Sequence, residues 1–219
     1  FDLTAACSGF LFALVTAAQY LRSGTMQRAL VIGADQLSRW VDWDDRRSCV
    51  LFGDGAAAVA LEATSFMANG LLDFNLKSDG SRGDCLNLPL STAHLQLVEN
   101  ISYQSGGYRP IEMNGQEVYK FAVKEVPKIL EDLLRKNQIS PKGIDWLLLH
   151  QANQRILDAV ADRFEIPRDK VLSNLAKYGN TSASTIPLML DEAVRDGRIK
   201  KGDLIASSGF GAGLSWGAA

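Results

Sequence analysis

The feature that most constrains the fold is the alternation of short apolar runs with longer helical patterns. Residues 29–34 (ALVIGA) and 144–149 (IDWLLL) are almost wholly apolar and of strand length, which is typical of strands covered on both faces. Residues 8–23 are apolar on almost every side, so this segment predicts a helix buried between layers. Residues 115–137 and 182–196 predict two further helices. Strands that alternate with helices indicate a layered α/β fold.

The remaining pattern predicts shorter elements and one long connection. Residues 79–109 are polar and contain glycine, so we expect an irregular connection there. Gly-rich turns are expected at two places, residues 53–55 and 209–213. The other predicted elements are strands at 48–52, 56–62, 71–77 and 203–208, a short extended piece at 170–172, and a helix at 153–164.

Composition excludes several classes of protein. The chain has 219 residues, of which 47% are hydrophobic, and its formal net charge is −2. Electrostatic attraction therefore favours binding neither to nucleic acid nor to an anionic membrane. No apolar run reaches membrane-spanning length. The three cysteines (Cys7, Cys49, Cys85) are unpatterned and there are only two histidines, which argues against a disulfide framework or a zinc site and favours a reducing compartment.

Both ends of the chain fall within apparent strands. The first residue is Phe1, and residues 214–219 read as an unfinished strand. A catalytic cysteine seven residues from a true terminus would lie where chains fray. We therefore expect a fragment that lacks a substantial N-terminal portion.

Cys7 is the strongest single candidate for chemistry. It lies where an extended run gives way to the apolar helix that follows. The positive end of a helix dipole stabilises a thiolate relative to the thiol, and a thiolate is an effective nucleophile. The alternative is a small buried cysteine without a chemical role, the usual state of a free cysteine.

Two further segments carry polar groups beside regular elements. His150 ends a predicted buried strand, at the edge where α/β sheets place ligands. Asn180 lies in a Gly-Asn-Thr-Ser sequence before a helix, and Gly211 and Gly213 follow the last strand. Taken singly, His150 reads as a core histidine, Asn180 as a turn or helix cap, and the glycines as turn residues.

Together these segments resemble the β-ketoacyl-acyl-carrier-protein synthase III family, the initiating condensing enzymes of type II fatty-acid synthesis. The resemblance extends from Phe1 to Ala219. Its carriers are residues 6–10 (ACSGF), 51–56 (LFGDGA), 150–153 (HQAN), 179–182 (GNTS) and 209–213 (GFGAG) with Trp216-Gly217. Five ordered motifs at family-like separations make the signal highly specific.

The resemblance implies a thiolase-like αβαβα fold of two similar halves, with the opening part of the first half missing. Because such a fold needs those strands to complete its sheet, we expect these 219 residues by themselves to be unstable, aggregated or inactive. Residues 1–112 would be the remainder of the N-terminal half, with the nucleophilic cysteine and a connection. Residues 113–219 would be the C-terminal half, with the histidine and asparagine. The resemblance also implies a homodimer, no tightly bound cofactor, no metal, and a bacterial cytoplasmic or plastid stromal location.

The implied reaction is a decarboxylating condensation. Cys7 would take the acyl group of a short acyl-CoA primer, acetyl-CoA by default, and malonyl-acyl-carrier-protein would then lose CO2 and attack it. His150 and Asn180 would donate hydrogen bonds to the thioester oxygen that gains charge. The backbone N–H groups of Cys7 and Ala212 would form the oxyanion hole. CoA and its pantetheine arm would contact Arg46, Gly115, Tyr119, Ala152, Asn153, Arg155 and Ile156, and the acyl pocket would comprise Leu37, Phe52, Met113 and Phe210.

Other functions remain open at this level. A related synthase of secondary metabolism would use the same fold to make another ketone. A silent interaction module would keep the motifs as structural relics, and a thiol hydrolase would release the acyl group to water. A papain-like protease also uses Cys, His and Asn, but its local signatures are absent. Primer length and branching stay undetermined, because one methylene changes selectivity by only ~1–3 kcal/mol.

Overall fold

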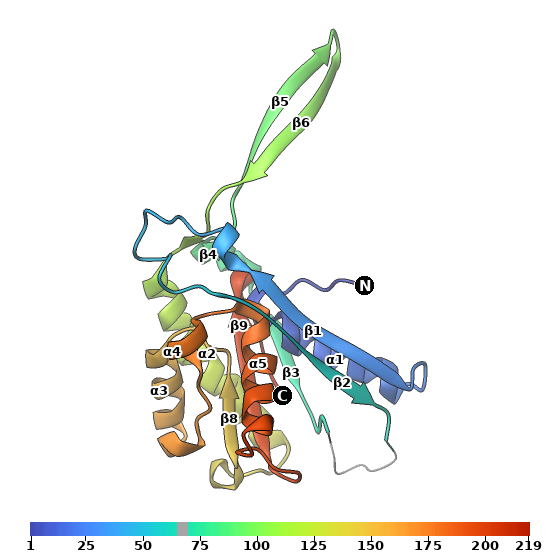
Figure 1. The fold of residues 1–219 in the computed structure, drawn as a ribbon, viewed down its shortest axis with the longest axis vertical. Coiled ribbons are helices and arrows are strands. Elements are labelled where there is room, and N and C mark those ends of the chain that lie inside the picture. Colours follow the sequence, from blue (N-terminus) through green and yellow to red (C-terminus); the bar gives the residue numbers. More distant parts are fainter. Residues whose placement is uncertain (65–69) are drawn as a thin grey trace.

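The computed structural model describes residues 1–64 and 70–219. Its fold is an α/β fold of stacked layers (Figure 1). The helices are α1 (Gly9–Arg22), α2 (Gly115–Lys136), α3 (Gln154–Arg163), α4 (Leu175–Tyr178) and α5 (Thr185–Arg195). The strands are β1 (Arg28–Gln36), β2 (Asp54–Glu62), β3 (Asn75–Ser78), β4 (Leu86–Asn87), β5 (Leu90–Val98), β6 (Ile101–Tyr108), β7 (Glu112–Met113), β8 (Trp146–Leu149), β9 (Ile205–Gly211) and β10 (Ser215–Ala218). Short 3₁₀ helices include η1 (Ala6–Ser8), η2 (Leu37–Arg39), η6 (Ser182–Ser184) and η7 (Ala212–Leu214).

The central sheet has the strand order β3-β10-β9-β8. β8 and β9 run parallel, and β10 pairs antiparallel with both β9 and β3. A second, two-stranded sheet joins β1 and β2 antiparallel, with Gln36 opposite Asp54. The prediction of helices alternating with strands is confirmed for α1, α2, α3, α5, β1, β8 and β9.

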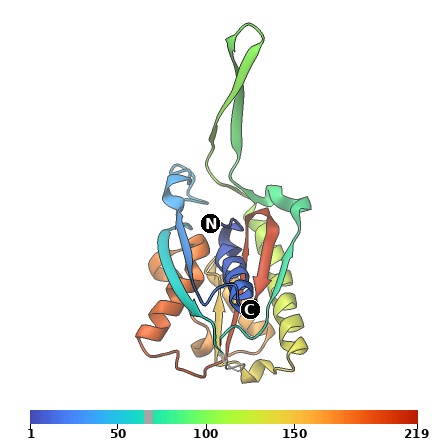
Figure 2. The ribbon, with the colours of Figure 1, turned by 90° about the vertical axis from the view of Figure 1, so that its right-hand side faces the viewer.

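Two hydrophobic cores lie on opposite faces of the central sheet. Leu147 and Leu149 of β8 pack with α2 and α3 on one face. Leu148, which points the other way as the strand period requires, packs with α1 and α5. Val31 of β1 joins this second core, so α1 and α5 lie between the two sheets (Figures 1 and 2). The described layers are therefore helix, sheet, helix, sheet.

The outer face of the β1–β2 sheet is open in this chain. Leu30 and Ile32 of β1 are 63% and 59% exposed, whereas Val31 between them is buried. The expectation that β1 is covered on both faces is therefore wrong for the described residues. An uninterrupted apolar run predicts two covered faces, and this chain supplies the cover for one of them.

The irregular connection expected at residues 79–109 is wrong for residues 90–108, which form two paired strands. β5 and β6 pair as a long hairpin that projects from the layered body (Figure 1). Asn100 turns the chain with a left-handed φ of 64°, a conformation that asparagine adopts more readily than most residues. The described side chains of the hairpin are exposed on both faces, so the sequence has no buried-face alternation from which to predict strands.

The strand expected at residues 48–52 and the turn expected at 53–55 are both wrong. The backbone of Ser48 and Cys49 bonds back to Asp45 in consecutive turns, and Val50 is 68% exposed. Strand β2 begins directly at Asp54. The run 49–52 reads as a strand by composition, but its end pairs with the segment at Asn180 instead.

The Gly-rich turn predicted at 209–213 is shifted along the chain. Gly209 and Gly211 lie within β9, and the turn is η7, residues 212–214.

Among the described residues, none of the helices is both long and apolar enough to cross a membrane.

Candidate active site

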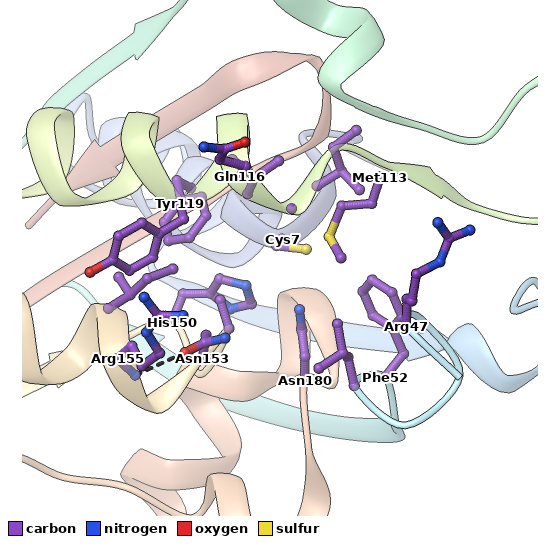
Figure 3. Close-up of a pocket in the computed structure, with 17 residues that line it drawn as sticks. Cys7, Arg47, Phe52, Met113, Gln116, Tyr119, His150, Asn153, Arg155 and Asn180 are labelled. Carbon is purple, nitrogen blue, oxygen red and sulfur yellow. Dashed lines mark hydrogen bonds between the residues drawn. The ribbon is translucent and has the colours of Figure 1, made fainter. Parts of the chain in front are cut away.

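A pocket of about 430 Å³ lies where η1, the start of α2, the end of β8 and the segment before η6 meet (Figure 3). Cys7, His150 and Asn180 all line it, although they come from three distant parts of the sequence. In Figure 3 the Cys7 sulfur lies between the His150 ring and the start of α2, and the Asn180 nitrogen points into the same space. The full lining is Cys7, Arg47, Leu51, Phe52, Leu86, Met113, Gly115, Gln116, Val118, Tyr119, His150, Ala152, Asn153, Arg155, Ile156, Asn180 and Phe210.

Cys7 is held in the short helix η1, directly before α1. Ala6, the residue before it, has a left-handed φ of 45°, a strained conformation that clusters at functional sites. Ser8 N–H bonds to the carbonyl of Ala5 at 3.1 Å and closes the turn. The turn therefore presents the sulfur at the pocket while the backbone stays packed.

The thiol of Cys7 is not activated in the resting site. Burial raises the pKa of Cys7 from 9.0 to about 11, and the negative charge of Asp35 adds to the increase. A hydrogen bond from Ser182 acts in the opposite direction. The expectation that the helix end would favour a thiolate is therefore wrong for the resting site, because desolvation of the buried charge is the largest cause of the shift. Cys7 is a neutral thiol at pH 7.

His150 follows β8 and is buried. Its backbone N–H bonds to the Ser208 carbonyl of the neighbouring strand at 2.8 Å, and its ring packs edge-on against Phe210. Nδ1 lies 2.7 Å from the Thr185 hydroxyl oxygen. Burial lowers the pKa of His150 from 6.5 to about 3, so the ring is neutral and carries a single N–H.

Asn180 is held by its backbone and its side-chain oxygen. Its N–H bonds to the Leu51 carbonyl at 2.8 Å, and its carbonyl accepts from Gly53 N–H at 2.9 Å. Its Oδ1 accepts from the backbone N–H of Ser182 at 2.9 Å. Because that backbone donor requires the oxygen, the NH2 group is the part of the amide left for the pocket.

Ser182 links these groups and is the residue whose importance the sequence conceals. Its hydroxyl donates to the Cys7 sulfur at 3.3 Å, while its N–H bonds to Asn180. Ser182 is buried and has a left-handed φ of 54°. A run of small hydroxyl residues before a helix is the available signal in the sequence, and it reads first as a helix cap.

Gly211 lets the last strand approach the cysteine turn closely. A Cβ at this position would come within 2.5 Å of Cys7 N and 3.0 Å of Ser8 N. Its φ of −157° is ordinary extended backbone, so the requirement for glycine is one of space. Gly53 is in a similar position against the Tyr178 carbonyl.

Aromatic and cationic groups lie at the rim of the pocket. The Arg155 guanidinium stacks on the Tyr119 ring at 4.8 Å, and its backbone N–H bonds to Asn153 Oδ1 (Figure 3). Arg47 also lines the pocket and is paired with Asp45, two residues earlier in the chain, at 2.8 Å. These groups offer positive charge and polar contacts to an anionic ligand.

Three predicted site residues lie outside the lining. Arg46 is exposed next to Arg47, which takes the place at the pocket that we expected for Arg46. Leu37 lies in η2, and Ala212 lies in η7 against the core that contains α2. The other predicted residues are all part of the lining. Arg47, Leu51, Leu86, Gln116 and Val118 line the pocket without having been predicted.

Within the described parts of the chain, no group of three or more His, Cys, Asp and Glu side chains is placed to hold a metal ion.

Comparisons with known proteins show which family this chain resembles in sequence and in fold. Residues 1–80 match the model of 3-oxoacyl-[acyl-carrier-protein] synthase III, and residues 134–219 match that of its C-terminal part. The β-ketoacyl-[acyl-carrier-protein] synthase III of Prochlorococcus marinus strain MIT 9313 is 79% identical over all 219 residues, which span 65% of that protein. That of Synechococcus sp. strain RCC307 is 74% identical over the whole chain and 66% of its own length.

A crystal structure of the Aquifex aeolicus synthase III has the same fold, with a TM-score of 0.87 at 40% identity. This chain aligns over its whole length with 65% of that structure. The thiolase-like α/β fold expected from the motifs is thereby confirmed. The chain spans slightly less than two thirds of the length of these relatives. This chain therefore belongs to the β-ketoacyl-[acyl-carrier-protein] synthase III family.

Proposed function

We propose that the protein containing this chain condenses a short acyl-CoA primer, acetyl-CoA by default, with malonyl-acyl-carrier-protein and releases CO2. The product is a β-ketoacyl-carrier-protein, the first intermediate of type II fatty-acid synthesis. The observation that carries the proposal is the meeting of Cys7, His150 and Asn180 at one pocket. The high identity to relatives named for this synthase favours it over a ketone synthase of secondary metabolism.

In the first half-reaction the Cys7 sulfur attacks the thioester carbonyl of the acyl-CoA. The bond from carbon to the CoA sulfur breaks, and the thiol proton of Cys7 ends on the departing CoA. Because the resting thiol is neutral, proton loss accompanies the attack. The backbone N–H groups of Cys7 and Ala212 receive the oxyanion. The close approach of β9 to η1 at Gly211 supports this role by placing the segment before Ala212 beside the cysteine turn.

In the second half-reaction malonyl-carrier-protein enters the same pocket. Loss of CO2 leaves an electron pair on the adjacent carbon and negative charge on the thioester oxygen. A ring N–H of His150 and the NH2 of Asn180 stabilise that charge, and the carbon then attacks the acyl group on Cys7. The bond from the acyl carbon to the Cys7 sulfur breaks, and the sulfur leaves as a thiolate that takes up a proton and returns to the resting thiol. The orientation of the Asn180 amide by Ser182 supports its role as a donor. Loss of one such donor costs ~2.7–4 kcal/mol of barrier, a ~10²–10³-fold decrease in kcat.

The pocket lining also supports binding roles. Gly115, Tyr119, Ala152, Asn153 and Ile156 form its walls and bind the pantetheine arm. Arg46 contacts the CoA nucleotide, and Arg155 attracts the acidic carrier protein and the CoA phosphates. Phe52, Met113, Phe210 and Leu37 limit the length of the primer. Arg46 and Leu37 have weaker support than the others, because they lie outside the lining.

The whole protein functions as a homodimer of two-halved subunits, with residues 1–112 contributing the nucleophile and residues 113–219 the two donors. The open outer face of the β1–β2 sheet supports further contacts in the assembly. The cyanobacterial relatives favour a bacterial cytoplasm over a plastid stroma. No tightly bound cofactor enters these steps.

The test is to incubate the protein with radiolabelled acetyl-CoA and to locate the label by peptide mass spectrometry. We expect label on Cys7, transfer to product when malonyl-carrier-protein is added, and no label in Cys7→Ala. Cys49→Ala and Cys85→Ala are the matched controls, since neither residue lines the pocket. Intact protein without label indicates a silent module, and rapid release of acetate indicates a hydrolase. Either result would overturn the proposal.

A further inference from the structure

The neutral ring of His150 has two nitrogens and one proton, and the position of that proton determines what the ring can do. With the proton on Nε2, Nε2 donates a hydrogen bond. With the proton on Nδ1, Nε2 can only accept one. The proposed function requires a donor. The partner of Nδ1 therefore decides whether His150 can stabilise a negatively charged oxygen.

That partner is Thr185, the first residue of α5. Its hydroxyl oxygen lies 2.7 Å from His150 Nδ1 and 3.0 Å from the Ser182 carbonyl oxygen. Both Thr185 and His150 are almost completely buried, with exposed fractions of 1% and 2%. A hydroxyl carries one proton, so it can donate to only one of these two acceptors at a time.

The distances favour donation to the ring. Hydrogen bonds from a hydroxyl to an oxygen are typically ~2.7–2.8 Å long, whereas those from an N–H to an oxygen are ~2.9–3.0 Å. The 2.7 Å separation of Thr185 Oγ1 from Nδ1 matches a hydroxyl donor, and the 3.0 Å separation from the Ser182 carbonyl is long for one. The Ser182 carbonyl also accepts the backbone N–H of Thr185, so it keeps a partner when the hydroxyl turns to the ring.

We propose that Thr185 is a positioning residue whose hydroxyl donates to Nδ1 of His150 and so keeps the ring proton on Nε2. This inference rests on the proposed function only for the reason why a proton on Nε2 is useful. The arrangement itself is a property of the resting protein.

The same turn then organises all three reacting groups. Ser182 contacts Cys7 and Asn180 directly, and Thr185, three residues later, contacts His150. A single turn of chain at the start of α5 thus places the nucleophile and orients both donors.

The primary experiment is long-range proton–nitrogen NMR on protein with isotope-labelled histidine, which distinguishes the two neutral tautomers. The chain contains only one other histidine, His94, and a His150→Gln variant assigns the signals. We expect His150 with its proton on Nε2 near neutral pH. We expect Thr185→Val to lose this preference and Thr185→Ser, which keeps the hydroxyl, to retain it. A proton on Nδ1 in the unmodified protein, or an unchanged tautomer in Thr185→Val, would overturn the proposal.

The kinetic experiment measures two half-reactions separately. We expect Thr185→Val to slow malonyl-thioester decarboxylation by ~10–100-fold, somewhat less than removal of the donor itself, and to leave acetylation of Cys7 within about 3-fold. Thr185→Ser should restore decarboxylation. Ser184→Ala is the matched control, because its equally buried hydroxyl bonds to the Thr181 carbonyl and not to the ring. Equal losses in both half-reactions, or a loss in Ser184→Ala as large as in Thr185→Val, would contradict the specific role.

The NMR result needs no substrate, so it separates the two proposals. A protein that shows the expected tautomer but forms no acyl-enzyme would sink the proposed function and leave the role of Thr185 standing. A protein that condenses normally with the ring proton on Nδ1 would do the reverse.

Discussion

A methyl group at Gly211 should disturb the cysteine turn directly. In Gly211→Ala the new Cβ would lie 2.5 Å from Cys7 N and 3.0 Å from Ser8 N. Favourable contacts between such atoms begin near 3.5 Å, so about 1 Å of displacement is required. The backbone angles of residue 211 are extended and open to alanine, which leaves steric overlap as the cause.

The magnitude follows from which atoms must move. Overpacking a tight interior costs ~1–3 kcal/mol, and the upper end applies here because both obstructing atoms are backbone. About 3 kcal/mol corresponds to a decrease in Tm of ~6–12 °C for a chain of this size. Displacing the nucleophile by about 1 Å should also slow acylation of Cys7 by ~10²-fold.

The assay is thermal unfolding followed by circular dichroism, together with the rate of Cys7 acetylation. Gly143→Ala is the matched control, since no atom lies within 4 Å of its added Cβ and its φ is not left-handed. A Tm within ~2 °C of the unmodified protein, with unchanged acetylation, would refute the argument that Gly211 is required for space.

Three further predictions concern titration and hydrogen bonding. Because burial raises the pKa of Cys7 from 9.0 to about 11, the unfolded chain loses this proton first. The free energy of unfolding should therefore fall by roughly 2–3 kcal/mol between pH 9 and 11 in urea titrations, and Cys7→Ala should lack this decrease. Because burial lowers the pKa of His150 to about 3, the unfolded chain binds a proton first as the pH falls. Stability should drop by roughly 2 kcal/mol between pH 6.5 and 5, and an equal drop in His150→Gln would contradict this origin. Ser182→Gly removes the hydroxyl that donates to the sulfur while keeping a left-handed φ accessible. The pKa of Cys7 should rise further, so iodoacetamide should alkylate it more slowly at pH 9, and an unchanged rate would show that this hydrogen bond is unimportant.

The local sequence pattern was sufficient to predict the helices and strands that bury one or both of their faces. α2 and β8 were predicted within one or two residues, because burial imposes a helical period on one and a continuous apolar run on the other. The same reasoning failed where burial is absent. The β5–β6 hairpin is exposed on both sides, and Val50 belongs to an apolar run that folds as exposed turns.

At the pocket, the motifs predicted which residue types are present but not which neighbouring residue faces the cavity. The motifs identified the cysteine, histidine and asparagine, but Arg47 lines the pocket where Arg46 was expected. Neighbouring residues of a turn point in different directions, and a motif does not specify which one faces a cavity. Thr185 went unnoticed because a threonine at the start of a helix has an ordinary capping explanation.

The amino-acid sequence alone predicted the buried helices and strands and named Cys7, His150 and Asn180 as the candidate reacting groups, because both are encoded in short segments. The tertiary structure decided the state of those groups. Burial reversed the expected shift in the pKa of Cys7, and Ser182 reaches its sulfur from 175 residues away. Desolvation and hydrogen bonding depend on which distant segments pack together around the pocket, and only the tertiary structure determines that packing.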